Sequence, residues 1–323
     1  MKLATITLVA WVAAAAIGVL VRSDYFVTVA TAAAFLGVWG QSWNLLSGLT
    51  GNISLGHSVF VALPVYVTLI LFQQHEISPL LGAFLGIATA VGLAAIIGTA
   101  TLRLSGPYFS LATLSSAAVV LSLILHYSDL TGGPSGIAIA FAHDSPLDLE
   151  FTNVRVYFLI AVTLLAAVTL FLGLIKRSRL GYAIAAIKSS EAAAAAAGIR
   201  VAFVKVVIFC LSAALTALGG VVYVFYIGFA DPNFLSGLAL SVEIALVAVV
   251  GGTGYLAGPV VGAIFYEAID AGANAAFGAA GGWDVLILGF SVVALVMTEP
   301  RGLCEIAAWL GQSVRRRVGA AEV

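Results

Sequence analysis

Ten long stretches of almost uninterrupted apolar sequence restrict what this 323-residue chain can fold into. They cover residues 3–21, 26–46, 57–73, 79–102, 108–127, 154–175, 204–228, 236–251, 258–275 and 283–298. A hydrocarbon core of ~30 Å is crossed by about 20 apolar residues in a helix, and the stretches approach that length. Charged residues make up 9% of the chain, whereas a soluble domain carries roughly a quarter. We therefore expect an all-α polytopic membrane protein with about ten transmembrane helices.

The first stretch, which follows Lys2, has the position of a signal peptide. It is long, however, and no clear small-residue cleavage site follows it before Arg22 and Asp24. We interpret it as a membrane span, so that residues 1–323 form a single transmembrane domain.

The basic residues predict the orientation of the chain, because cytoplasmic loops carry an excess of Lys and Arg. With the N-terminus in the cytoplasm and ten spans, two basic residues fall outside, Arg22 and Arg155. Twelve fall inside: Lys2, Arg103, Lys176, Arg177, Arg179, Lys188, Arg200, Lys205, Arg301, Arg315, Arg316 and Arg317. We therefore expect both termini in the cytoplasm, and we expect the long loops at 128–153 and 176–203 to lie outside and inside, respectively.

Small residues recur at helical spacing in two of the expected spans. In the fourth span they are Gly82, Gly86, Ala90, Ala94 and Gly98, and in the seventh they are Ser212, Thr216 and Gly220. Such a row lets another helix approach closely. We interpret both rows as packing surfaces.

Two glycine-rich segments do not have the pattern of simple spans. SGLTGNISLGHSVF (47–60) and VVGGTGYLAGPVVGA (249–263) both contain G-x-T-G and both lead into a new apolar helix. Glycine is favoured where backbone bends or approaches closely, and a broken helix at membrane depth survives only against protein or water. The similarity of the two segments suggests an internal repeat.

Residues 188–200, KSSEAAAAAAGIR, place an alanine run in the most basic part of the chain. Ser190 suits an N-cap, Glu191 puts negative charge in the first turn, and Gly198 is a natural helix stop. The helix between them, roughly 10 Å long, cannot span a bilayer.

A helix this short is unstable by itself in water, so it must lie against something. The lipid surface or its own bundle is one candidate, and a groove in a cytoplasmic partner is the other. We favour the partner, because alanine holds lipid poorly compared with Leu, Phe or Trp.

The same loop carries a resemblance to a known family. Glu191, Ala192, Ala193 and Gly198 form the pattern E-A-A-x-x-x-x-G, which resembles the cytoplasmic signature of bacterial ABC importer permeases. RSRLGYAIAAIKSSEAAAAAAGI resembles the corresponding loop of the branched-chain amino-acid permease family. Four other segments resemble further motifs of that family and occur in the same order: GLTGNISLGHSVF, TGGPSGI, SVEIALVAVVGGTGYLAGPVVGA and EPRGL. The order points to the LivM-like half of a two-permease pair.

The resemblance implies a type II ABC-importer-like permease bundle in a bacterial inner membrane. Its coupling helix, here carried by Ser190, Glu191, Ala192, Ala193 and Gly198, would sit in a cleft of an ATP-binding subunit. The implied partners are two cytoplasmic ATP-binding subunits, a second homologous permease and an extracytoplasmic solute-binding protein, besides membrane lipid. The expected solutes are branched-chain amino acids or related small polar solutes such as other amino acids, urea and amides.

The residues themselves do not indicate an enzyme. A P-loop needs G-K-[ST], and none of the four lysines follows a glycine, so ATP hydrolysis is expected in other subunits. No His, Cys and Asp cluster has metal spacing, and we expect no cofactor and no nucleic-acid partner. Cys210 and Cys304 are interpreted as free packing thiols.

Two glutamates, Glu243 and Glu267, lie inside spans, where a charge is costly unless it is paired or wet. They keep open the alternative of a stand-alone secondary transporter or channel. Asn52, Ser54, His57, Glu243 and Thr253 are our candidates for the substrate pathway, because broken helices can offer backbone N–H and C=O groups to a solute. A purely structural role is the alternative for His57, which can bond the exposed carbonyls of a broken helix.

Overall fold

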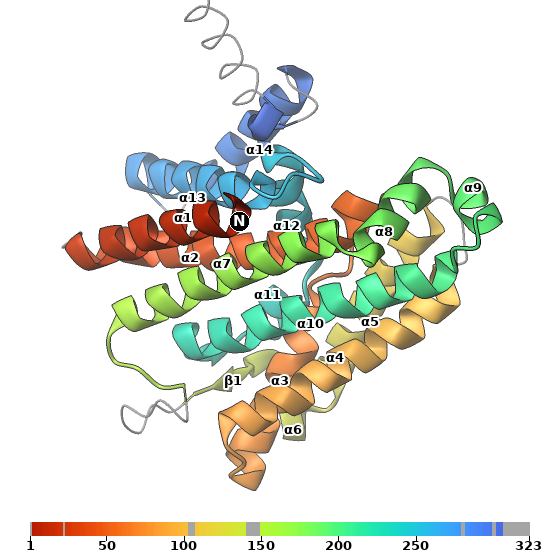
Figure 1. The fold of residues 1–323 in the computed structure, drawn as a ribbon. Coiled ribbons are helices and arrows are strands. Elements are labelled where there is room, and N and C mark those ends of the chain that lie inside the picture. Colours follow the sequence, from red (N-terminus) through yellow and green to blue (C-terminus); the bar gives the residue numbers. More distant parts are fainter. Residues whose placement is uncertain are drawn as a thin grey trace, which may run out of the picture.

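The structure is a computed structural model that describes residues 2–21, 23–102, 107–139, 149–278, 282–298 and 302–305. It is a bundle of helices (Figure 1). Some residues behind the predictions lie outside the described part: Arg22, Arg103, part of loop 128–153, the first three residues of EPRGL, and Arg315, Arg316 and Arg317.

A helix lies in each of the ten predicted segments. In chain order these are α1 (Lys2–Leu20), α2 (Asp24–Trp43), α3 (Val59–His75), α4 (Pro79–Thr101), α5 (Tyr108–His126), α7 (Val154–Arg177), α10 (Val201–Ile227), α12 (Leu238–Gly251), α13 (Gly258–Phe277) and α14 (Trp283–Thr298). Among the described residues, α4, α5, α7 and α10 are long and apolar enough to cross a membrane. The chain is therefore a mostly helical polytopic protein, and the number of about ten spans stays a prediction.

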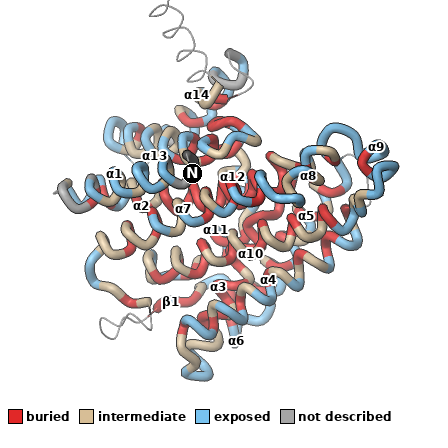
Figure 2. The backbone as a smooth tube through the Cα atoms, in the orientation of Figure 1, coloured by how far each residue is buried: buried red, intermediate tan, exposed pale blue. Residues whose placement is uncertain are grey.

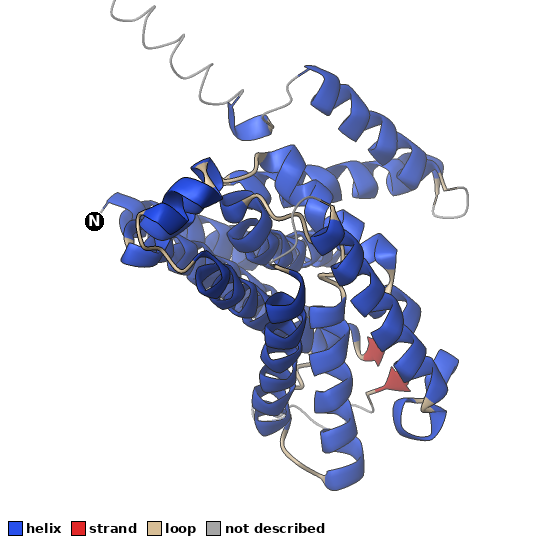
Figure 3. Ribbon diagram, turned by 90° about the vertical axis from the view of Figure 1, so that its right-hand side faces the viewer, coloured by secondary structure: helices blue, strands red, loops and turns tan. Residues whose placement is uncertain are grey.

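Shorter elements connect these helices. They are the π-helix η1 (Asn44–Gly48), α6 (Ser128–Thr131), the 3-10 helix η2 (Gly133–Ser135), β1 (Ile137–Ala138), α8 (Arg179–Ser189), α9 (Glu191–Ala196), β2 (Phe229–Ala230) and α11 (Pro232–Ser236). The two strands pair antiparallel, with Ile137 opposite Ala230 (Figure 3). The expectation of an all-α fold misses this small sheet, because two-residue strands are too short to show a period of two.

The bundle has two distinct ends. At one, which we call the strand end, β1 and β2 are joined to α3, where the Tyr66 hydroxyl donates to the Ala230 carbonyl at 3.1 Å. At the other, which we call the basic end, α8 and α9 project from the bundle beside the end of α7 (Figure 1). The basic loop 176–203 thus lies at the opposite end from the sheet.

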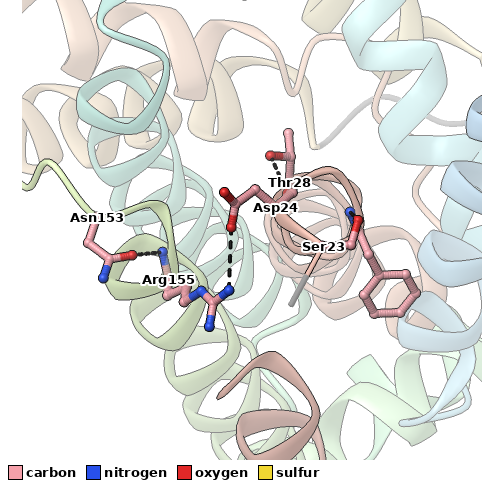
Figure 4. A network of polar contacts seen from close by, with 6 residues as sticks. Ser23, Asp24, Thr28, Asn153 and Arg155 are labelled. Carbon is pink, nitrogen blue, oxygen red and sulfur yellow. Dashed lines mark hydrogen bonds and ion pairs between the residues drawn. The ribbon is translucent and has the colours of Figure 1, made fainter. Parts of the chain in front are cut away.

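The N-termini of α2 and α7 lie side by side (Figure 4), and α7 runs from there to the basic end (Figure 1). Arg155 Nη2 is 3.4 Å from Asp24 Oδ1; the Asp24 side chain is exposed, and the Arg155 side chain is half-buried. The Asn153 side chain caps α7 by accepting from the Arg155 backbone N–H at 3.0 Å. Arg155, an exception to the predicted charge distribution, therefore has an acidic partner at the start of the neighbouring helix.

The predicted row of small residues on α4 is confirmed as a packing surface. Gly82, Gly86, Ala90, Ala94 and Gly98 are all buried, while the neighbouring positions on the outer side of α4 are exposed (Figure 2). A Cβ on Gly82 or Gly86 would press against backbone atoms of α3, and one on Gly98 would meet a side chain of α10. The row lets α3 and α10 pack closely on α4.

The outward faces of the bundle are strongly apolar. Phe84 on α4 is 72% exposed and Phe290 on α14 is 82% exposed. A soluble monomer rarely exposes such large contiguous apolar surfaces, whereas a lipid bilayer accepts them. The exposed surface therefore agrees with a protein that is integral to a membrane.

Candidate functional site

The predicted helix at the basic end is confirmed. α9 begins after Ser190, whose hydroxyl accepts from the Ala193 backbone N–H at 3.3 Å. Gly198 has φ +86°, a conformation that side chains with a Cβ rarely adopt, and its backbone N–H donates to the Ala195 carbonyl at 2.9 Å. The cap and the glycine therefore fix where this short helix starts and stops.

α9 rests on its own bundle through one alanine. Ala194 is buried against α8 and α10, whereas Glu191, Ala192, Ala193 and Ala195 are exposed. Contact with the bundle, one of the two alternatives left open by the sequence, is thus present. It still leaves the alanine face of α9, formed by Ala192, Ala193 and Ala195, exposed. α9 lies at the tip of the molecule (Figure 2).

Glu191 also anchors α9 to α10. Its Oε1 lies 2.5 Å from Nζ of Lys205, whose side chain is 2% exposed while that of Glu191 is 58% exposed. A buried ammonium is costly unless it is paired. Sequence reasoning placed both residues at the cytoplasmic surface but missed their pairing, which joins residues 14 positions apart.

The helix before α9, α8, was also missed. Ser178 caps it by accepting from the Gly181 backbone N–H, and its buried face contains Ile184 and Ile187. Leu180, Ile184 and Ile187 have the i, i+4, i+7 spacing of an amphipathic helix. This spacing, together with the cap at Ser178, is the signal in the sequence that indicates α8.

The two G-x-T-G segments meet at the basic end. The Asn44 side chain accepts from the Gly254 backbone N–H at 2.7 Å and donates to the Tyr255 carbonyl at 3.0 Å. The last glycine of each motif, Gly51 and Gly254, has φ +82°. The two motifs therefore share a left-handed last glycine, whereas their second residues differ, with φ −91° at Leu49 and +114° at Gly252. The first motif begins at the last residue of a π-helix, a distortion that is common at functional sites.

Residues 51–58 enter the bundle as non-helical backbone, and α3 begins at Val59. The adjoining Ser58 meets a second break between α11 and α12: its backbone N–H donates to the Ser241 hydroxyl at 2.9 Å, and its hydroxyl donates to the Ser236 carbonyl at 3.3 Å. Two interrupted helices are therefore joined inside the protein, where irregular backbone at membrane depth is tolerated.

His57 is fully buried beside this junction. Its Nδ1 lies 2.8 Å from Ser54 Oγ and its Nε2 lies 2.9 Å from Ser212 Oγ. The Ser212 hydroxyl donates its hydrogen to the Ser42 carbonyl, so it accepts from His57. We therefore assign the neutral tautomer with hydrogen on Nε2, and Ser54 as the donor to Nδ1. Both ring nitrogens are used within the protein, in agreement with a structural role.

The structure brings together some of the predicted pathway residues and separates others. Ser54 and His57 are bonded to each other, and Asn52, just before them, is half-buried and bonded to Thr50. Thr253 is exposed at the basic end, next to Gly254.

Glu243 lies apart from this group. It is two residues from Ser241, which faces the glycine-rich turn, so it points about 200° away around α12. It lies beside the Tyr266 hydroxyl of α13 instead, close enough to interact with it.

Glu267 lines an apolar groove of about 560 Å³ that is formed by α1, α2, α7 and α13. Among the described residues that line this groove, Glu267 is the one with a charged side chain. Glu243 and Asp270 are close enough to interact with it. Within the described part of the chain, no group of three or more His, Cys, Asp or Glu residues is arranged to hold a metal ion. Cys210 and Cys304 are both free thiols.

Comparison with known proteins gives several matches. The family described as "Branched-chain amino acid transport system / permease component" matches residues 25–296. The high-affinity branched-chain amino acid transport system permease protein LivM of Escherichia coli is 27% identical over 305 residues, which cover 86% of this chain and 69% of LivM. LivM of Salmonella typhimurium gives the same identity and coverage.

A relative with a different substrate in its name is the fructose import permease protein FruG of Bifidobacterium longum. It is 29% identical over 273 residues, which cover 78% of this chain and 75% of FruG. No solved structure gives a significant match.

Proposed function

The chain belongs to the branched-chain amino acid transport system permease component family, and from this membership we propose that it is the permease subunit of an ATP-driven importer. Its membrane is the bacterial inner membrane, and both termini and the basic end face the cytoplasm. The basic loop supports this orientation, because Lys and Arg are retained on the cytoplasmic side.

The observation that carries the proposal is the geometry of α9. It is a capped helix of six residues at the tip of the basic end, fixed to α10 by Glu191 and Lys205 and open on its alanine face. An isolated helix of this length would not hold its shape, but an anchored one can enter a groove as a rigid body. Ser190, Glu191, Ala192, Ala193 and Gly198 form the proposed coupling element.

The sequence has no P-loop, so the proposed ATP hydrolysis belongs to other subunits, and the family membership supports the number and kind of the proposed partners. Two cytoplasmic ATP-binding subunits bind and hydrolyse ATP, a second homologous permease completes the pathway, and an extracytoplasmic solute-binding protein delivers the solute. This chain supplies part of the pathway and the surface that receives the ATPase movement.

The proposed solutes are branched-chain amino acids or related small polar solutes. The names of the two LivM relatives support the amino acids, and the name FruG is the reason to keep other polar solutes in the test. Asn52, Ser54, His57, Glu243 and Thr253 remain the proposed pathway residues. The first three lie at or beside the junction of the two interrupted helices, which supports them more strongly than Glu243.

Gentle co-purification from native membranes tests the docking surface. Ala192→Trp fills the exposed alanine face and should abolish recovery of the ATP-binding subunit. Ala118→Trp, at an exposed position on α5, adds the same bulk elsewhere and should leave recovery unchanged. Equal recovery with both variants would contradict docking through α9.

A stand-alone secondary transporter or channel is the competing function. The neighbouring carboxylates of Glu243 and Glu267 favour it, because intramembrane carboxylates commonly carry ions. It predicts that the purified chain alone moves solute down an ion gradient, and that Glu243→Gln abolishes this movement. Transport that needs ATP and the partner subunits would exclude it.

A further inference from the structure

Lysines of the basic loop contact both glycine-rich segments. Lys188 of α8 donates from Nζ to the Gly48 carbonyl at 2.7 Å, and Lys176 of α7 donates to the Gly254 carbonyl at 2.6 Å. These bonds join positions 140 and 78 residues apart in the chain. The loop that carries α9 is thus tied directly to the ends of two interrupted helices.

The two carbonyls are adjacent in space. Asn44 already bonds to the second segment. The two glycines also lie so close that a Cβ added to Gly48 would be 3.0 Å from the Gly254 nitrogen, and one added to Gly254 would be 3.9 Å from Lys188 Nζ. Gly48, Gly254, Lys176 and Lys188 therefore form one contact, which we call the lysine junction.

Electrostatics explains why lysines occupy these positions. Gly48 ends η1, the continuation of α2, and Gly254 follows the end of α12. The last carbonyls of a helix lack partners inside it and carry partial negative charge. Lys188 neutralises the helix end at Gly48, while Lys176 donates to a carbonyl of the turn that follows α12. These two acceptors hold together two ammonium groups that would otherwise repel each other.

The contacts also link the junction mechanically to α9. α8 runs from Arg179 to Ser189 and is followed at once by α9, which packs against it through Ala194. A push on α9 that turns the α8–α9 pair must therefore move Lys188 relative to Lys176, which belongs to the long helix α7. The bond from Lys188 to Gly48 is the one that such a movement strains first.

We propose that Lys176 and Lys188 are positioning residues that transmit movement of the coupling element to the two glycine-rich segments. This inference rests on the proposed function. With both lysine bonds formed, the lysine junction holds Gly48 against Gly254. Displacement of α9 by the ATP-binding subunits then separates the two glycines. Neither lysine contacts the solute.

The test uses the complete transporter, reconstituted in proteoliposomes with its solute-binding protein, and measures solute uptake and ATP hydrolysis in the same sample. Lys188→Gln, Lys176→Gln and the double variant should assemble and hydrolyse ATP within about two-fold of the unmodified protein. Uptake per ATP should fall at least five-fold in the double variant. Lys188→Arg, which can still donate to the carbonyl, should restore most of the ratio.

Arg177→Gln is the matched control. Arg177 is exposed at the end of α7, and its side chain makes no hydrogen bond or ion pair with the residues that the structure describes. Its neutralisation removes one positive charge, as each single lysine variant does, without touching the junction, so the uptake per ATP should not change. An equal ratio in Arg177→Gln and in the double lysine variant would overturn the inference.

A distance measurement covers the case in which the double variant does not fold. Spin labels at the exposed Tyr182 of α8 and Tyr255 should show a distance that changes between nucleotide-free and ATP-bound complexes with both lysines intact. An unchanged distance would overturn the inference while ATP-dependent uptake continues. Loss of ATP dependence in the unmodified protein would instead overturn the proposed function, and the inference with it.

Discussion

The carboxylate of Glu191 and the ammonium of Lys205, 2.5 Å apart, join the first residue of α9 to the buried side of α10. Glu191 belongs to the family-like signature of this loop, and its carboxylate points to the bundle as well as to solvent. The ion pair therefore holds α9 in place, and this anchoring is the part that we propose for Glu191 in coupling.

Removing Glu191 should leave Lys205 buried without its partner. We expect Glu191→Ala to lower the free energy of unfolding by about 1 kcal/mol, at the low end for a charged hydrogen bond because Glu191 itself is exposed. Glu191→Ala with Lys205→Met should regain this stability, since both charged groups are gone. SDS titration in mixed micelles measures the change.

The same pair of variants separates stability from coupling. The double variant should remain defective in uptake per ATP, because α9 has lost its anchor. Full uptake in a double variant of normal stability would show that the anchor has no mechanical role.

Gly198→Pro should uncouple ATP hydrolysis from uptake without unfolding the bundle. Proline fixes φ near −65°, whereas Gly198 requires +86°, so the end of α9 must change shape. The tip of the molecule is exposed, which confines the damage to the loop. Uptake and ATP hydrolysis are measured in the same sample. Gly198→Asn is the control, because asparagine tolerates a positive φ and should leave the end of α9 unchanged.

Ser212→Ala should destabilise the bundle core. It leaves the Nε2 hydrogen of His57 without an acceptor in a fully buried site, at a cost of about 1–3 kcal/mol. Ser115→Ala is the control, because Ser115 is exposed on α5 and bonds a carbonyl of its own helix. Equal stability of the two variants would contradict the assigned His57 network.

Much of the fold could be predicted from the sequence because membrane helices are local features. Long apolar stretches must satisfy their own backbone hydrogen bonds, so each of the ten became a helix. The row from Gly82 to Gly98 and the cap at Ser190 likewise depend on neighbours within a few turns. These features need no knowledge of the rest of the chain.

The site could be predicted only in part, because its decisive contacts are long-range. Nothing in the local pattern of Lys176 or Lys188 indicates that each donates to a glycine carbonyl far away in the chain. Their positive charge predicted a membrane side and nothing more specific. Glu243 shows the converse: its place in an apolar stretch suggested the pathway, but the helix turns it toward Tyr266 and away from the junction at Ser58.

The most direct test of the account is solute uptake by the reconstituted complex with ATP, compared with a non-hydrolysable analogue and with an ion gradient alone. We predict uptake of a branched-chain amino acid or related polar solute with ATP only, and its loss in Ala192→Trp. Uptake by this chain alone on an ion gradient, unaffected by Ala192→Trp, would contradict the account.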